Sequence, residues 1–277
     1  MLKRILTSIV ALAVFIPYLY FAEKVDFLFP MAMGGCALFS TYELLKSLKL
    51  DKKYWLTFPI YLACYACPFA IRYLGVQTAL PLFVAAIFLF ILYALGITVL
   101  SQGKNDVTLI CTGLLLGIYV LAGFTGIEFL HEFRKGGEYI YLLTFIGAWV
   151  TDIFAYFTGR LIGKHKLIPK VSPKKTVEGA IGGVVFCTLF FVGFALLYNH
   201  FLRGEGEIIP LWLIAIVGVI TSIVSQFGDL AMSVVKRHFG IKDFGKIFPG
   251  HGGMLDRFDS VIAVSIFLSV SLGLTIM

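Results

Sequence analysis

The stretch LPLFVAAIFLFILYALGITVL, from Leu80 to Leu100, decides the class of fold to which this chain belongs. None of its residues is charged, and a helix needs about 20 mostly apolar residues to cross a hydrocarbon core of roughly 30 Å. We expect this segment to cross a bilayer as an α-helix, because a helix satisfies its backbone hydrogen bonds internally.

Stretches of similar length and character recur on both sides of this segment. The chain has 277 residues, of which 59% are hydrophobic and 14% charged, so a soluble globular domain is excluded. We predict an all-α polytopic membrane protein with nine spans, five in residues 1–138 and four in residues 139–277. The nine expected spans are Ile5–Ala22, Phe27–Leu45, Trp55–Leu74, Leu80–Leu100, Val107–Gly123, Tyr139–Thr158, Gly179–Phe201, Ile208–Gln226 and Phe258–Met277.

The basic residues predict the orientation of these spans. Nine spans place the amino terminus and every even-numbered connection on one side, and that side carries 18 of the 23 lysines and arginines. Cytoplasmic loops of membrane proteins carry the excess of Lys and Arg, so we expect the amino terminus in the cytoplasm. The opposite side carries the other five, which are Lys24, Arg72, Arg134, Lys135 and Arg203.

One polar segment follows the sixth span on the expected cytoplasmic side. Asp152, Tyr156, Gly159 and Arg160 stand at helical positions i, i+4, i+7 and i+8, so they share one face that can line a polar cavity.

The stretch from Ser172 to Thr176 follows shortly afterwards and combines two hydroxyls with the ammonium groups of Lys174 and Lys175. A helix start comes next, where backbone N–H groups favour anions, and this combination suits phosphate. The alternative interpretation is a flexible basic loop that ends in a helix N-cap.

A second polar segment follows the eighth span. If that helix continues past Gln226, then Asp229, Ser233, Lys236 and Arg237 also lie on one face. The glycines that come afterwards are expected to end the helix.

The glycines Gly250, Gly252 and Gly253 permit the chain to fold back and present His251. Asp256 and Asp259 then share a face at the start of the ninth helix.

The acidic residues of both segments need a physical explanation. A carboxylate at membrane depth is costly unless it is paired, protonated or bound to a cation. Mg²⁺ takes carboxylate and phosphate oxygens as ligands, and neighbouring Lys and Arg neutralise the remaining phosphate charge. The residues therefore favour a metal-phosphate site over a purely structural network of ion pairs. Its candidate metal ligands are Asp152, Asp229, Asp256 and Asp259.

The second segment resembles the signature of the phosphatidate cytidylyltransferase family, also called CDP-diacylglycerol synthases. The match has a dozen fixed positions within 27 residues, which makes it a specific signal. The first segment, from Asp152 to Gly179, resembles the companion segment of that family. The matching positions of the signature are Ser233, Lys236, Arg237, Lys242, Asp243, Pro249, His251, Gly252, Gly253, Asp256, Arg257 and Asp259.

The resemblance implies that CTP and phosphatidic acid react to give CDP-diacylglycerol and pyrophosphate, a step of phospholipid biosynthesis. It implies dependence on Mg²⁺, with one or two divalent cations or a second cation of another kind, and a catalytic region in residues 139–277. The expected location is the cytoplasmic (inner) membrane, with the site facing the cytoplasm. The expected partners are CTP, phosphatidic acid, membrane lipids and a second copy of the chain in a homodimer, and no nucleic acid.

The roles of single residues follow from the same chemistry. We expect Asp229 and Asp256 as the main metal ligands, with Asp259 and Asp152 as weaker candidates. His251 either donates a hydrogen bond to the leaving pyrophosphate or structures its loop, and Asp243 orients Lys242 or Arg237. The residues expected at the triphosphate or the lipid phosphate are Arg160, Ser172, Lys174, Lys175, Thr176, Lys236, Arg237, Lys242 and Arg257.

Two other functions use similar residues. A CTP-dependent lipid kinase would transfer the γ-phosphate and release CDP. A transporter also uses intramembrane acids and broken helices, but here the charges gather at one end and no inverted repeat is visible. Glu43, in the second expected span, fits a transporter or a structural role equally well and stays unassigned.

Overall fold

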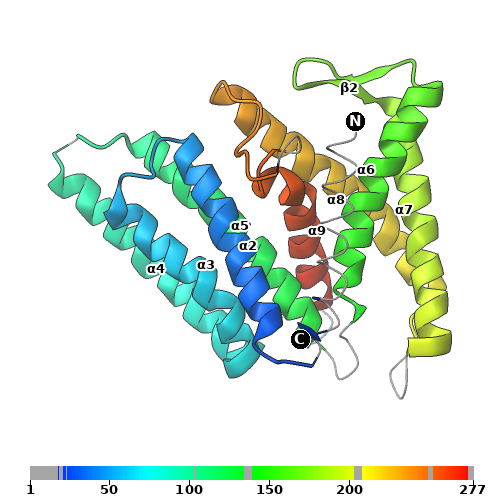
Figure 1. Ribbon diagram of the computed structural model, residues 1–277, viewed down its shortest axis with the longest axis horizontal. Helices are drawn as coiled ribbons and strands as arrows, with labels where there is room; N and C mark the ends of the chain where they lie inside the picture. Colours follow the sequence, from blue (N-terminus) through cyan, green and yellow to red (C-terminus); the bar gives the residue numbers. More distant parts are fainter. Residues whose placement is uncertain are drawn as a thin grey trace. The chain divides into compact units, whose positions relative to one another are not determined.

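The protein is described by a computed structural model and is an all-α membrane protein apart from one short β-hairpin (Figure 1). Within the residues that the structure describes, seven helices, α2 to α8, are long and apolar enough to cross a membrane. The described residues are 18, 21–22, 24–102, 104–133, 139–202, 208–248 and 252–273.

The chain forms two compact units. The first contains Met1–Phe129 and Ile241–Arg257, and the second contains Leu130–Gly240 and Phe258–Met277. Two of the three boundaries between the units fall inside continuous helices, α5 (Val107–Glu132) and α9 (Leu255–Gly273), and the third lies between Gly240 and Ile241. The expected functional division into residues 1–138 and 139–277 stays a prediction.

The first unit is built on α2 (Leu28–Ser47), α3 (Tyr54–Leu74) and α4 (Val76–Leu100), with α3 packed against both others. A small residue allows α2 and α3 to approach closely, since a Cβ atom on Gly34 would lie 3.0 Å from the carbonyl oxygen of Tyr65. Gly34 therefore serves tight helix packing, as expected for small residues in membrane helices.

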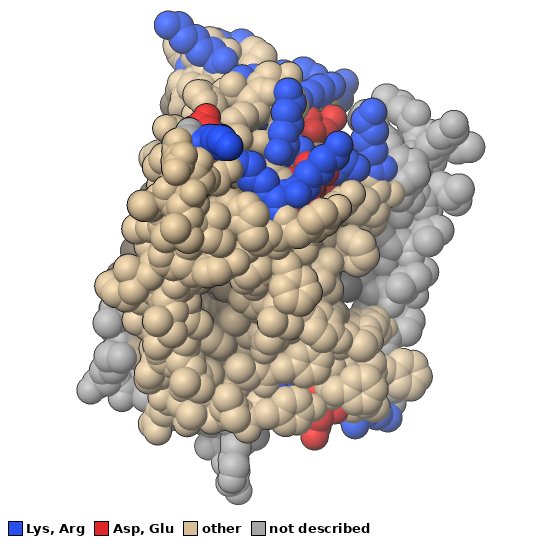
Figure 2. Space-filling model, turned by 90° about the vertical axis from the view of Figure 1, so that its left-hand side faces the viewer, with Lys and Arg blue, Asp and Glu red and all other residues tan. Residues whose placement is uncertain are grey.

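The helix α4 has almost no buried surface of its own. Its buried residues are Ala79 and Ala94, while large side chains such as Phe88 and Leu89 are about two-thirds exposed. Such a surface is stable only where lipid replaces water. On the face shown in Figure 2, charged side chains lie at the two ends and uncharged residues fill the band between them.

The second unit packs α6 (Leu142–Ile162), α7 (Val177–Leu197) and α8 (Leu211–His238) against one another, and a π-helical turn, η2 (Tyr198–Leu202), follows α7. Polar side chains bond between these helices. The buried hydroxyl of Thr151 donates to Ser222 at 2.9 Å, and Gln226 donates to the carbonyl of Ala180 at 3.2 Å.

A β-hairpin connects α6 to α7 where a loop was expected. Its strands are β1 (Lys166–Ile168) and β2 (Ser172–Thr176), which pair antiparallel with Lys166 opposite Thr176. Thr176 is the N-cap of α7 and accepts a hydrogen bond from the backbone N–H of Gly179 at 3.1 Å. The expected N-cap is thus confirmed, but the preceding segment is an ordered hairpin.

In the described part of the chain, seven of the nine predicted spans correspond to helices that could cross a membrane, and the ninth corresponds to α9, which is not among those seven. Most of their ends lie within a few residues of the prediction, and two differ clearly. The fifth helix continues nine residues past the expected end at Gly123, because it keeps Glu128 buried instead of stopping before the acidic residue. The eighth helix continues to His238 and is followed by Gly240, which has a φ of 67°. Nearly all of the first expected span, Ile5–Ala22, lies outside the described residues.

The close packing between α6 and α7 predicts how two glycine substitutions change the stability of the protein. A Cβ atom on Gly179 would lie 2.6 Å from the backbone oxygen of Ala155, whereas a Cβ atom on Gly193 of the same helix meets nothing within 4 Å. Gly179→Ala should therefore lower the unfolding midpoint in detergent. Gly193→Ala should leave it unchanged or raise it, because alanine favours helix by about 1 kcal/mol. Equal midpoints for the two variants would contradict this packing.

Candidate functional site

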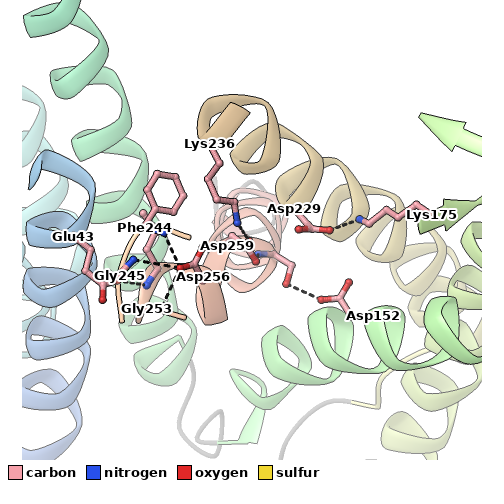
Figure 3. Close-up of polar contacts among 12 residues, drawn as sticks. Glu43, Asp152, Lys175, Asp229, Lys236, Phe244, Gly245, Gly253, Asp256 and Asp259 are labelled. Atoms are coloured by element: carbon pink, nitrogen blue, oxygen red, sulfur yellow. Dashed lines mark hydrogen bonds and ion pairs between the residues drawn. The ribbon is translucent and has the colours of Figure 1, made fainter. Parts of the chain in front are cut away.

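Three aspartates from three helices of the second unit lie on facing sides of those helices (Figure 3). Asp152 belongs to α6, Asp229 to α8 and Asp259 to α9. We call them the aspartate group. Asp259 is 6% exposed, and a buried carboxylate requires a compensating charge or hydrogen bonds.

Two lysines neutralise part of the negative charge of the aspartate group. Lys175 of β2 forms an ion pair with Asp229, and Lys236 of α8 places its Nζ 3.6 Å from Oδ2 of Asp259 (Figure 3). Lys236 is itself 9% exposed. The site thus holds carboxylates and ammonium groups together in a poorly hydrated place, where electrostatic interactions are stronger than in water.

Ser260 connects Asp152 to Asp259. Its hydroxyl donates to Oδ2 of Asp152 at 3.3 Å, and its backbone N–H donates to Oδ1 of Asp259 at 2.9 Å. The ligand atoms of the aspartate group do not all lie within 4.8 Å of one another. This spread suits Mg²⁺, which usually takes only one or two protein carboxylates and fills its other positions with water and phosphate oxygens.

Asp256 has a different environment, in the first unit. Its Oδ2 accepts backbone hydrogen bonds from Phe244 at 2.8 Å and from Gly253 at 2.9 Å (Figure 3). These donors come from the two described parts of the connection between α8 and α9, residues 239–248 and 252–254. Asp256 therefore fixes this connection, a role that its sequence position alone did not indicate.

Glu43 of α2 is the residue that the sequence left unassigned. It is 3% exposed, and its Oε2 accepts a hydrogen bond from the backbone N–H of Leu255 at 3.0 Å. Leu255 is the first residue of α9, so Glu43 binds one of the N–H groups that a helix start leaves without an intrahelical partner. A lone acid in an apolar span was the signal that could have indicated such a role.

The glycines of the connection fit closely around these carboxylates. Gly252 has a φ of 84°, which favours glycine, and a Cβ atom on Gly253 would meet the carboxylate of Glu43. The backbone N–H of Phe248 also donates to the carbonyl of Gly252 at 2.9 Å. The glycines of the predicted signature therefore allow the backbone to pass beside two acidic side chains.

Comparisons with known proteins agree with the family that the sequence resembles. The family model described as the cytidylyltransferase family matches residues 2–275. The chain belongs to the cytidylyltransferase family. It is therefore a membrane-bound nucleotidyltransferase.

Members of the family in staphylococci carry the name phosphatidate cytidylyltransferase. The protein of Staphylococcus haemolyticus is 36% identical over 277 residues, which cover 97% of this chain and 98% of that protein. The proteins of Staphylococcus saprophyticus and Staphylococcus aureus (strain COL) are each 43% identical over 178 residues. Those two matches cover 64% of this chain and 65% of the relatives' length.

The residues of the predicted polar face of α6 have two kinds of contact. Asp152 accepts a hydrogen bond from Ser260, whereas Gly159 packs close to Thr176 and Gly179. Arg160 is exposed and donates to the hydroxyl of Tyr156 at 3.2 Å.

The other predicted phosphate-binding residues lie at or near the expected helix ends. Thr176 is buried and caps α7, which gives it a structural role. Lys174, Arg237, Lys242, Asp243 and Arg257 are exposed, and Ser172 is half-buried. His251, together with Pro249 and Gly250, lies outside the described residues.

The contact between Glu43 and Gly253 predicts compensation between two substitutions. Gly253→Ala alone should lower both activity and the unfolding midpoint, because its Cβ atom collides with Glu43. Glu43→Ala alone should do the same, because Leu255 loses its acceptor. In the double variant the new Cβ atom has space. The losses of activity and of unfolding midpoint in that variant should therefore be clearly smaller than the sums of the two single losses. Additive losses in a double-mutant cycle would show that the contact does not matter.

Proposed function

We propose that this chain is a phosphatidate cytidylyltransferase, which converts CTP and phosphatidic acid into CDP-diacylglycerol and pyrophosphate. Family membership over residues 2–275 and the names of the staphylococcal relatives support this activity. The observation that carries it is the aspartate group with its two lysines, because it combines oxygen ligands for a cation with ammonium groups for phosphates.

The reaction needs charge neutralisation more than proton transfer. An oxygen of the lipid phosphate attacks the α-phosphorus of CTP, and the bond to the β-phosphate breaks as pyrophosphate leaves with its electron pair. Because the attacking oxygen is already anionic, no strong general base is required. Positioning of the two phosphates and stabilisation of the developing negative charge should supply most of the rate.

The residues of the second unit supply these functions in the proposal. The aspartate group binds Mg²⁺, which neutralises phosphate charge when it is bound. Lys175 and Lys236 are paired with Asp229 and Asp259 and would be available to phosphate oxygens once those carboxylates held a cation. Exposed Lys174 and Arg237 add positive charge for the triphosphate or the lipid phosphate.

The start of α9 and the connection before it supply the remaining candidates. Asp256 precedes Asp259 by about one helical turn on α9 and is proposed as a further metal ligand, in addition to its contacts with the backbone. Lys242 and Arg257 are proposed to bind phosphate, with Asp243 orienting a basic neighbour. His251 is proposed as a hydrogen-bond donor to pyrophosphate.

Orientation and assembly complete the proposal. The excess of basic residues on one set of connections supports a site that faces the cytoplasm from the inner membrane. A homodimer is proposed from the family resemblance, and mass measurement of the protein in lipid nanodiscs tests it: a mass of one chain would contradict it.

Removal of the metal tests the proposed chemistry. The purified protein in detergent, given CTP and phosphatidic acid, should form CDP-diacylglycerol and pyrophosphate in equal amounts. A chelator should abolish both products, and added Mg²⁺ should restore both, because the carboxylates would otherwise repel the triphosphate. Product formation that persists at full rate with the chelator would contradict a metal-phosphate site.

A further inference from the structure

A second group of side chains able to bind a metal lies on α5, and the proposed reaction assigns no role to it. Glu128, His131 and Glu132 each offer one ligand atom, and these atoms all lie within 4.8 Å of one another. The three residues stand at i, i+3 and i+4 of one continuous helix, so they share a face of α5 (Val107–Glu132). The geometry of this group is a property of that helix alone.

Glu128 is the member that most requires a ligand. Its side chain is 0% exposed, and within the described part of the chain neither carboxylate oxygen has a hydrogen-bond partner. Arg72 acts on it electrostatically but forms its ion pair with Asp26, at 2.9 Å. Buried polar atoms are nearly always hydrogen-bonded or bound to an ion. A buried carboxylate with one oxygen close to a histidine and a second carboxylate therefore indicates a cation.

His131 is arranged as a metal-binding histidine often is. The residue is 4% exposed, and its Nδ1 lies 3.3 Å from Oε1 of Glu132. A ring nitrogen and a carboxylate oxygen at this separation can both be ligands of one cation, because two ligands at about 2.1 Å in a tetrahedral shell lie about 3.4 Å apart. The ring also packs at 5.3 Å from that of Tyr141, which limits its rotation.

We propose that Glu128, His131 and Glu132 bind a divalent transition-metal ion of the Zn²⁺ type. An imidazole with carboxylates suits Zn²⁺ better than Mg²⁺, which prefers oxygen ligands and retains its waters. Glu-x-x-His on one helix is a metal-binding arrangement in helical proteins. Three protein ligands at about 2.1 Å would leave a fourth tetrahedral position for water or another ligand. The site is separate from the aspartate group and does not depend on the proposed reaction.

Metal binding by the purified full-length protein tests the proposal. The affinity tag is removed, and excess Mg²⁺ is present to occupy the aspartate group. Binding of Zn²⁺ is measured by competition with a coloured chelator, and Co²⁺ substitution is followed by its visible absorption. The wild type should bind one Zn²⁺ per chain and show the absorption of Co²⁺ with nitrogen and oxygen ligands. Glu128→Gln and His131→Ala should each weaken binding at least about tenfold, by analogy with losses at other metal sites.

Two further variants serve as controls: one replaces a histidine outside the proposed site, and the other changes a ligand that is partly exposed. His200→Ala removes an exposed histidine of η2 and should bind Zn²⁺ as the wild type does. Glu132→Gln alters a side chain that is 28% exposed and should fold even if the buried variants do not. It should bind Zn²⁺ more weakly, and Zn²⁺ should raise the unfolding midpoint of the wild type more than that of this variant. Wild type without stoichiometric Zn²⁺, or Glu132→Gln and Glu128→Gln with unchanged affinity, would overturn the site.

Discussion

Replacement of Asp229 by Asn should lower the rate of cytidylyl transfer by about 10²- to 10³-fold, the usual effect of removing one group that stabilises transition-state charge. Asparagine keeps the size of the side chain but removes the charge that a cation needs. Lys175 also loses its ion-pair partner, so the phosphate-binding charge is no longer held in place. The initial rate of CDP-diacylglycerol formation at saturating Mg²⁺ measures the effect.

A matched aspartate separates this effect from a general loss of charge. Asp26 is exposed and pairs with Arg72 at 2.9 Å in the first unit. Asp26→Asn should leave the rate within a factor of about two, because an exposed ion pair contributes little to stability. If Asp229→Asn and Asp26→Asn had equal rates, Asp229 would have no role in the proposed reaction.

Two substitutions of Asp256 should separate its backbone contacts from its proposed metal binding. Asp256→Asn keeps an oxygen that can accept from Phe244 and Gly253, whereas Asp256→Ala removes it. We expect both variants to lose at least about 10²-fold in rate, as is typical for loss of a group that stabilises charge. In hydrogen exchange, the amides of Phe244 and Gly253 should remain protected in Asp256→Asn and exchange faster in Asp256→Ala.

The outcome decides which role of Asp256 matters. Full activity of Asp256→Asn with protected amides would show that the residue only organises the connection between α8 and α9. Loss of activity with the amides still protected supports the charge, and therefore metal binding.

Much of the fold follows from the sequence because the bilayer imposes one rule on every span. A run such as Leu80 to Leu100 has no other stable structure in lipid than a helix. The eighth span was predicted to end at Gln226, but the helix continues to His238, so the shared face of Asp229 and Lys236 that such a continuation implied is present. The hairpin of β1 and β2 was not predicted, because its basic residues favoured a flexible loop beside a span and strand pairing depends on a partner that a local pattern does not reveal.

The sequence predicted which types of residue form the site, but it predicted few of the contacts between them. The signature indicated the acids, and the structure places Asp152, Asp229 and Asp259 on facing helices of one unit. The hydrogen bond between Glu43 and Leu255 joins residues 212 positions apart, and no local periodicity reports such a contact. For the same reason, the sequence did not show that Asp256 holds the amides of Phe244 and Gly253.

The most direct test of cytidylyl transfer follows CTP labelled separately at its α- and γ-phosphates. Purified wild type and Asp259→Asn are incubated with phosphatidic acid and Mg²⁺, and both lipid and pyrophosphate are counted. We expect the α-label to enter the lipid, the γ-label to leave in pyrophosphate, and Asp259→Asn to lose both by about 10²-fold or more. Appearance of the γ-label in lipid would show a lipid kinase and contradict cytidylyl transfer, and absence of all turnover in wild type would contradict both.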